Sequence, residues 1–443
     1  MTEYINHSQG TFAALTKEQK EAVGLLSIGT FLEYFDLMLY VHMAVLLNEL
    51  FFPKTDPHTA ALYSAAAFCS TYLLRPFGAL IFGWIGDNIG RKPTIIITTF
   101  MMALSCIVMA NLPTYEKIGV TAAWILTLCR MLQGISSMGE VIGAKIYLTE
   151  MTVPPVQYFV VTLISVFYVI GSTVALGIAS LVITYGLNWR IAFWIGAIIA
   201  IVGSVARIKL RETPEFADAK RRIKKYFAQA KVNIELLNDD PIYTEKTNKL
   251  TIISLFFISC GWPVCFYFVY IHCSHILKIS FNYSPEQIIH HNFIISIINL
   301  FGYFVLAYLS YIIYPLKILK VKLFILLPIA LITPYLLARV NTPLQLFLIQ
   351  SFYMLVVLSG NSAEPIFYKY FPIFKRFTHI SFLFAFSHAF MHIVISFGAV
   401  YLTEYFGHWG IVLFIMIPII IGSLFSIYHF ENLEHQSGKL PTH

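Results

Sequence analysis

The stretch GWIGDNIGRK, from Gly83 to Lys92, joins two apolar runs of the chain. It places three glycines, one acid and two bases in one short segment. Gly86 and Gly90 allow close packing and turning. Asp87 and Arg91 are four residues apart and able to pair. This pattern predicts a tight, charged hinge between two membrane spans.

The composition of the whole chain is that of a polytopic membrane protein. It has 443 residues, of which 58% are hydrophobic and 12% charged, whereas soluble domains average roughly 45–50% and 25%. A span needs about 20 mainly apolar residues. The sequence contains twelve such runs, whose length predicts helices: 22–50, 59–85, 94–112, 120–148, 157–184, 190–210, 249–277, 286–314, 321–339, 343–368, 377–403 and 408–430.

The distribution of positive charge predicts the orientation. Of the 30 Lys and Arg residues, 22 fall on the side that carries both termini, which indicates that both termini are cytoplasmic. A polar segment divides the spans six and six, a layout typical of transporters built from repeats. The predicted parts are an N-terminal tail (1–21), a six-helix half (22–210), a cytoplasmic linker (211–248), a second six-helix half (249–430) and a C-terminal tail (431–443).

Several other classes of protein are disfavoured. All six cysteines lie within predicted spans without a CxxC pair, so neither a disulfide framework nor a zinc site is expected. The net charge of +7 reports topology here, and we expect no nucleic-acid partner. No GxxxxGK[ST] phosphate loop occurs, no nucleophile or metal cluster is recognisable, and no cleavable signal is apparent. We expect neither an enzyme nor a cofactor.

The first span contains two acids one helical turn apart, Glu33 and Asp36. A charge inside a membrane is costly unless it is paired or faces water, so an intramembrane acid is a functional candidate. Both residues are therefore predicted to lie on a solute or proton pathway. The alternative is that one of them only pairs with a buried base such as Arg130.

The fourth span carries a polar stripe. Arg130, Gln133, Gly134 and Ser137 share one helix face, and Glu140 lies on the same side, seven residues after Gln133. Such a stripe must face the bundle interior or a cavity. We expect Arg130 to bind an anionic group such as a substrate carboxylate, and Glu140 to join an acid/base pair near the cytoplasmic end.

Lys145, further along the fourth span, is an unusual charge for which the sequence gives no role. A long basic side chain near the end of a span can snorkel to the inner surface, and this is the simplest expectation for it.

These motifs resemble a known family. The segment LLRPFGALIFGWIGDNIGRKP, Leu73 to Pro93, is similar to the first-half signature of the major facilitator superfamily. More narrowly, it resembles the metabolite:proton symporters, which include proline/betaine, α-ketoglutarate, citrate and shikimate transporters. The run FLEYFDLMLY (Phe31 to Tyr40) and the fourth-span pattern also match that family. Two departures are Asn88, where a base is usual, and Trp84, where histidine is usual.

The resemblance implies the major facilitator fold and a gating role for Gly83, Asp87, Gly90, Arg91 and Lys92 in the hinge. In that superfamily the loop aspartate faces the N-terminus of the eleventh span, where the helix dipole is positive. Asp87 would then hold the cytoplasmic face closed. The alternative is that these charges only set topology.

The resemblance is weaker in the second half. It implies that Tyr267, in the seventh span, faces the cavity. The matching hinge after the eighth span is lost, because the chain has SYIIYPLKILK at Ser310 to Lys320. His388 and His392, four residues apart in the eleventh span, are natural proton carriers. With no third ligand evident, polar lining is favoured over a metal site, and Glu364 is expected to hydrogen-bond within the same half.

Together these features predict a monomeric secondary active transporter of the bacterial inner membrane. Its partners would be the lipid bilayer, protons and a small carboxylate-bearing solute, such as proline/betaine or a dicarboxylate. A transporter-like solute sensor and an uncoupled facilitator are the alternatives, and the lost second hinge is the main support for a sensor.

Overall fold

The computed structural model describes residues 15–52, 72–207 and 247–438, and helices dominate all three stretches. The predicted linker 211–248 lies almost entirely outside these residues. The first group of long helices is α2 (Lys17–Phe51), α4 (Arg75–Asn88), α5 (Arg91–Asn111), α7 (Val120–Met151), α8 (Val156–Tyr185) and α9 (Arg190–Arg207), with the short α6 (Tyr115–Ile118) before α7.

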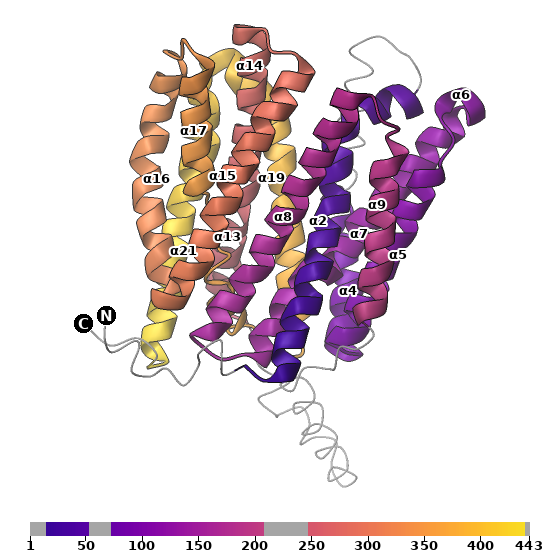
Figure 1. The fold of residues 1–443 in the computed structure, drawn as a ribbon. Helices are drawn as coiled ribbons and strands as arrows, with labels where there is room; N and C mark the ends of the chain where they lie inside the picture. The colour runs from indigo at the N-terminus through magenta and orange to yellow at the C-terminus, as the bar shows by residue number, and fades with distance from the viewer. Residues whose placement is uncertain (1–14, 53–71, 208–246, 439–443) are drawn as a thin grey trace.

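The second group follows the linker. It contains α13 (Lys249–Tyr267), η3 (Phe268–His272), α14 (Cys273–Phe281), α15 (Pro285–Ile312), α16 (Pro315–Leu337), α17 (Pro343–Leu355), α18 (Glu364–Tyr368), α19 (Arg376–Phe406), α20 (His408–Ile411), η4 (Val412–Met416) and α21 (Ile417–Gln436). Figure 1 shows the two groups side by side as two bundles. Each of the twelve predicted runs overlaps at least one of these helices.

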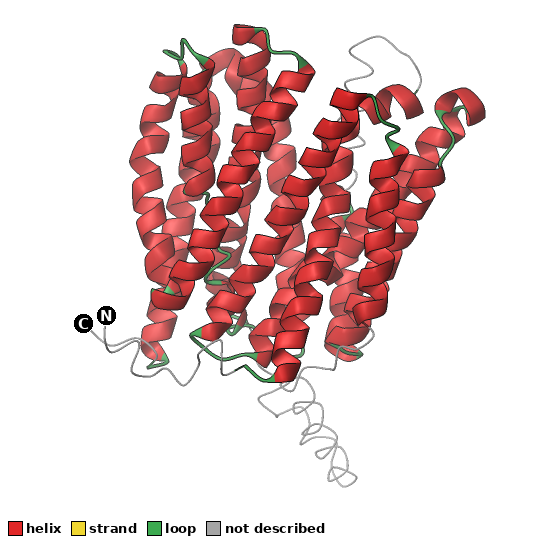
Figure 2. Cartoon of the chain, in the orientation of Figure 1, coloured by secondary structure: helices red, strands yellow, loops and turns green. Residues whose placement is uncertain are grey.

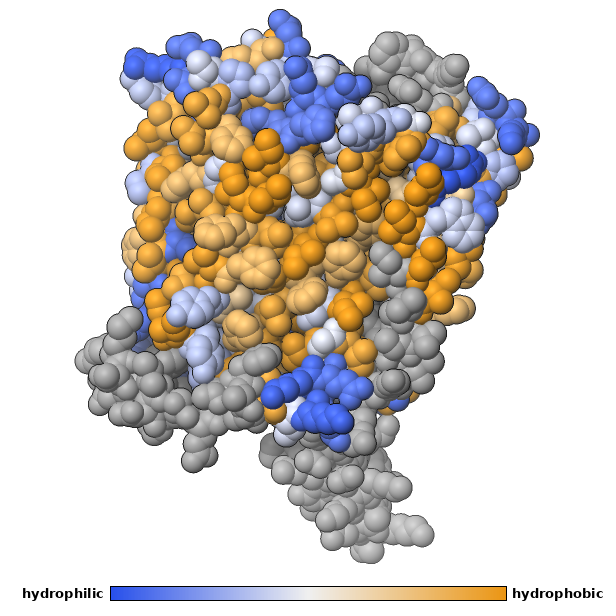
Figure 3. Space-filling model, in the orientation of Figure 1, coloured by the Kyte–Doolittle hydropathy of each residue, from blue (hydrophilic) through white to orange (hydrophobic). Residues whose placement is uncertain are grey.

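The surface supports a membrane-spanning assembly. Large side chains such as Phe77, Phe100, Trp124, Phe301 and Tyr308 are more than half exposed. Apolar residues form a belt around the middle of the face drawn in Figure 3, with polar residues at both ends. Within the described residues, seven helices are long and apolar enough to cross a bilayer. The predicted all-α membrane fold is confirmed.

Some helix starts follow directly from local sequence. Ser284 begins α15 with a capping box, in which its side chain accepts from the Gln287 backbone while the Gln287 side chain accepts from the Ser284 backbone. Thr342 and Gln345 start α17 in the same way. In both helices a proline follows the cap, where its missing N–H costs nothing.

The predicted span 343–368 is not one continuous helix, and this is a correction. α17 ends at Leu355 and α18 begins at Glu364, with a non-helical segment of residues 356–363 between them. Non-helical backbone at membrane depth is tolerated where protein buries it or where it lines a cavity. Gly261 and Gly360 permit the close approach of α13, because a Cβ on Gly261 would lie 2.5 Å from the Leu358 side chain.

The two bundles meet along two main seams, where α8 packs on α15 and α4 packs on α19. Glycines bring the second pair close together. A Cβ on Gly83 would lie 2.7 Å from the Cα of Thr378, and one on Gly86 would lie 2.7 Å from the Phe377 ring. Contacts this short are not tolerated, so side chains at 83 and 86 would separate α4 from α19.

Candidate functional site

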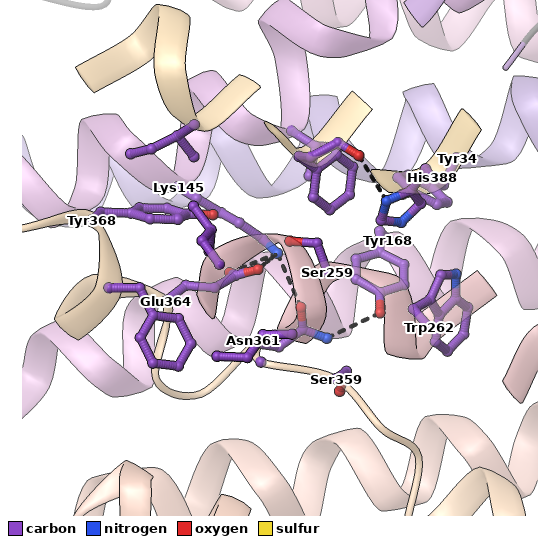
Figure 4. A pocket seen from close by; sticks show the side chains of 17 residues that line it. Tyr34, Lys145, Tyr168, Ser259, Trp262, Ser359, Asn361, Glu364, Tyr368 and His388 are labelled. Atoms are coloured by element: carbon purple, nitrogen blue, oxygen red, sulfur yellow. Dashed lines mark hydrogen bonds and ion pairs between the residues drawn. The ribbon is translucent and has the colours of Figure 1, made fainter. Parts of the chain in front are cut away.

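A cavity lies between the two bundles. The first bundle contributes side chains of α2, α7 and α8 to its wall, and the second contributes α13, the non-helical segment, α18 and α19. Its polar lining residues are Tyr34, Lys145, Tyr168, Ser259, Trp262, Ser359, Asn361, Glu364, Tyr368 and His388 (Figure 4).

An ion pair from opposite bundles occupies one side of this cavity. Lys145 Nζ on α7 lies 2.9 Å from Glu364 Oε1 and 2.7 Å from Oε2, and it donates to Asn361 Oδ1 at 3.2 Å. Lys145 is 2% exposed. The expectation that it snorkels to the inner surface is therefore wrong. Glu364 pairs with Lys145 across the bundle interface, and its side chain also interacts with Tyr368 of its own half, as expected.

The broken helix is what presents this pair. Because the chain leaves helical geometry between α17 and α18, Asn361 and the first residue of α18, Glu364, reach the cavity together (Figure 4). Asn361 Nδ2 also donates to Tyr303 Oη at 2.9 Å and to Tyr168 Oη at 3.2 Å, and these two hydroxyls share a hydrogen bond. One amide thus ties α8 and α15 to the ion pair.

The predicted polar stripe of the fourth span forms a different cluster. Arg130 Nη1 donates to Gln133 Oε1 at 2.9 Å, and the guanidinium lies 4.0 Å from the Tyr40 ring centroid. Gln133 also contacts Cys106 Sγ on α5, at 3.6 Å. None of these four residues is among the lining of the central cavity. The predicted role of Arg130 in holding a substrate carboxylate therefore does not follow from this cavity.

The other described residues of the predicted pathway also lie outside the lining of the central cavity. Glu33 and Asp36 are buried on α2, and Asp36 packs so closely on Gly196 of α9 that no side chain would fit there. Glu140 lies on α7, but its side chain is outside the described part of the chain. Tyr267 is half-buried and is not among the cavity-lining residues, whereas Trp262 of the same helix is.

The predicted hinge meets the second bundle at the start of α19. Asp87 Oδ2 accepts from Thr378 N at 2.8 Å and from Thr378 Oγ1 at 2.7 Å, while Oδ1 accepts from Phe377 N at 3.1 Å. The first N–H groups of a helix have no partner within the helix and carry its positive dipole. A carboxylate from the first bundle satisfies them here, in the arrangement that the family resemblance implied.

Arg91 extends this contact. It donates to Asp87 Oδ1 at 3.2 Å, to the carbonyl of Gly86 at 2.6 Å and to that of Ile373 at 2.9 Å. Glu150, at the end of α7, joins Arg91 at 3.0 Å and Arg376 of α19 at 3.1 Å.

Arg91, Asp87, Glu150 and Arg376 thus form a buried network of two acids and two bases that spans both bundles. The sequence analysis missed Glu150 and Arg376. Among the remaining hinge residues, Gly90 lies between α4 and α5, and Lys92 is half-buried in the first turn of α5.

The second hinge region makes a different contact. Ser310 lies 3.4 Å from Thr162 of α8, and the rings of Tyr311 and Phe159 are 6.4 Å apart. Tyr314 donates to Glu434 of α21 at 2.7 Å. The described residues 310–320 contain no acid that could take the place of Asp87. The contacts named here between α8 and α15 are made by neutral and aromatic side chains.

A second tyrosine, outside the predicted spans, also contacts Glu434. Tyr370, in the loop before α19, donates to Glu434 at 2.6 Å. Burial, together with this carboxylate, raises the pKa of Tyr370, which keeps its hydroxyl protonated as a donor. Within the described residues no group of three or more His, Cys, Asp or Glu could hold a metal ion.

A cavity between two helical bundles, with a broken helix in its wall and buried charged contacts joining the bundles, is the arrangement found in membrane transporters built from repeats. The sugar (and other) transporter family matches residues 23–249. The chain belongs to that family, within the major facilitator superfamily. This agrees with the predicted family and with the prediction that the protein is a transporter and not an enzyme.

Similar proteins are named as solute transporters. A proline/betaine transporter of Escherichia coli (strain K12) is 32% identical over 204 residues, which are 44% of this chain and 41% of that protein. A citrate-proton symporter of Salmonella typhi is 33% identical over 220 residues, or 48% and 49%. An inner membrane metabolite transport protein of Escherichia coli (strain K12) is 33% identical over 235 residues, or 50% and 52%. The matches span about half the length of these relatives.

Solved structures show the same fold over nearly the whole chain. A proton:xylose symporter bound to 6-bromo-6-deoxy-D-glucose has a TM-score of 0.72 at 12% identity, covering 94% of this chain and 95% of that one. The human organic anion transporter MFSD10 has a TM-score of 0.66 at 15% identity, with 94% and 100% covered. At such identities the likeness concerns the fold alone.

Proposed function

We propose that this protein is a proton-coupled secondary transporter that takes up a small carboxylate-bearing solute by alternating access. The solute would be an osmolyte such as proline or betaine, or a dicarboxylate. The protein would act as a monomer in a bacterial inner membrane, with both termini in the cytoplasm. The names of the relatives support the classes of solute and coupling ion, and the positive-inside charge bias supports the orientation.

The observation that carries the proposal is the buried Lys145–Glu364 pair. It joins the two bundles in the wall of the cavity between them. A buried ion pair is strongly destabilised when one partner is removed, because the remaining charge is uncompensated. A solute that reaches Lys145 and Glu364, or a proton that binds Glu364, changes this tie between the bundles. Solute and proton therefore act on the same contact.

Glu33 and Asp36 are the further acids proposed for the proton pathway. Both are buried at mid-length of α2, the helix that also contributes Tyr34 to the cavity. A charged carboxylate in such a place is stable only if a partner or water stabilises it; otherwise it is protonated. The role of Glu140 on α7 stays part of the same proposal.

The Asp87 network supports the alternating-access step. It joins α4, α5 and α7 of the first bundle to α19 of the second at the predicted cytoplasmic side. The described conformation is therefore closed there. Opening to the cytoplasm would require Asp87 to leave the start of α19, and this is the gating role proposed for the hinge.

The test is uptake of labelled L-proline, glycine betaine and citrate into proteoliposomes with an imposed inward proton gradient. Accumulation that a protonophore abolishes supports the proposal. Accumulation that survives the protonophore excludes proton coupling, and binding without accumulation favours a solute sensor. Lys145→Met should abolish accumulation. The control is Lys117→Met, at an exposed position of α6, which should leave accumulation unchanged.

A further inference from the structure

A second, smaller cavity adjoins the central one. The two cavities share three lining residues, Tyr34, Trp262 and His388, so these side chains border both spaces. The remaining lining residues of the second cavity are Leu37, Met38, Tyr72, Arg75, Phe266 and His392.

Arg75 is the charged residue of this second cavity. It begins α4 and is 2% exposed. Its Nε and Nη2 are buried and have no hydrogen-bond partner among the described residues, and its guanidinium lies 4.4 Å from the Tyr72 ring centroid. A buried guanidinium with two unpartnered nitrogens is costly, and an intramembrane charge of this kind is a candidate ligand site.

The surroundings of Arg75 favour an anion. No Asp or Glu is among the described residues that line this cavity. Arg130 of α7 interacts electrostatically with Arg75, and its own Nε and Nη2 also have no hydrogen-bond partner among the described residues. Two arginines thus raise the positive potential at the second cavity, whereas the Lys145–Glu364 pair lines the central cavity.

We propose that Arg75 binds the carboxylate of the transported solute. This rests on the proposed function, and it moves the carboxylate contact from the predicted Arg130 to a residue that lines a cavity. Arginine presents a planar fork of N–H donors that matches a carboxylate in a bidentate way, which lysine cannot reproduce. The rest of the solute extends past Tyr34 and Trp262 toward Lys145 and Glu364.

The test measures binding to the purified full-length protein by its thermal unfolding midpoint. The probes are L-proline, glycine betaine and citrate, each compared with sodium chloride at equal ionic strength. At least one probe should stabilise the wild type by mass action. Arg75→Gln should weaken that binding roughly 30-fold or more, because it removes a buried charged partner. The probe that responds distinguishes a zwitterion from a polycarboxylate.

Arg75→Lys serves if the glutamine variant does not fold. It keeps the charge and loses the fork, so binding should weaken by roughly tenfold. Arg339→Gln, an exposed arginine stacked on Tyr335, is the matched control and should bind as the wild type does. Wild-type affinity in either Arg75 variant would overturn the inference, as would a wild type that none of the three carboxylates stabilises beyond chloride.

Different results would exclude the anion site at Arg75 and the transport function. A probe that binds through Arg75 but never accumulates in proteoliposomes removes the transport function and leaves the anion site. Accumulation at the wild-type rate by Arg75→Gln removes the anion site and leaves the transporter.

Discussion

Asp87→Asn should shift the protein toward a conformation that is open to the cytoplasm. The carboxylate of Asp87 accepts four hydrogen bonds, from Phe377 N, Thr378 N, Thr378 Oγ1 and Arg91 Nη1. Asparagine keeps one acceptor oxygen, so two of the four are lost, together with the attraction of a full charge to the helix dipole. Hydrogen bonds to charged groups contribute about 1.5–3 kcal/mol each.

Part of that energy is recovered, because Asp87 and the freed N–H groups are hydrated when the gate opens. A net loss of about 2 kcal/mol is expected, which changes the ratio of closed to open states by roughly 30-fold. Such a shift is large enough to be seen directly as a change in the population of two distances.

The assay is a distance measurement by pulsed electron spin resonance between spin labels on Lys20→Cys and Gln436→Cys. Both positions are exposed, at the predicted cytoplasmic ends of α2 and α21. The five cysteines that the structure describes are buried, which limits labelling elsewhere. Asp87→Asn should raise the population of the longer distance.

Ser310→Ala, near the end of α15 at the other seam, is the control. It removes a neutral hydroxyl that lies 3.4 Å from Thr162, so its effect should stay below about 1 kcal/mol. An unchanged distance distribution in Asp87→Asn, or equal shifts in both variants, would refute the assigned gating role.

Four further substitutions test other features. Gly86→Ala should destabilise the closed state by about 1–3 kcal/mol, seen with the same labels, because its Cβ would meet the Phe377 ring at 2.7 Å. Lys145→Met and Glu364→Gln should each lower the free energy of unfolding by about 3–5 kcal/mol. The double variant should lower it by less than the sum of the two single effects. Asp36→Asn should make uptake insensitive to the proton gradient in a proteoliposome flux assay.

Each of these predictions has a result that would contradict it. Gly24→Ala is the matched control for the glycine, since nothing lies within 4 Å of the added Cβ. An equal effect at both positions would remove the packing argument. Strict additivity of the two ion-pair variants would show that Lys145 and Glu364 are not coupled. Proton-driven uptake by Asp36→Asn would exclude that residue from the proton pathway.

Much of the fold could be predicted, because membrane helices are specified locally. Apolar length fixes where a span lies, and glycine spacing with Asp87 indicated the hinge. The break at residues 356–363 could not be seen in this way. The segment is apolar enough to be read as part of one span, and its departure from a helix depends on close packing by α13 through Gly261.

The site was harder to predict, because its residues come from both bundles. Intramembrane charge marked Arg130 and Asp36 as candidates, whereas Lys145 was expected to snorkel to the inner surface. The signal does not tell which charges face each other across the interface. Glu364 meets Lys145 from 219 positions away in the sequence, and Asp87 meets Thr378 from 291 positions away. Pairings at such separations require the packed structure.

The most direct test of the central claim is accumulation of labelled solute in proteoliposomes by the wild type and by Lys145→Met, with and without an inward proton gradient. The account predicts gradient-dependent accumulation of at least one of L-proline, glycine betaine and citrate, and its loss in the variant. Accumulation by Lys145→Met at the wild-type rate would contradict the account, because transport would then proceed without the ion pair that joins the two bundles.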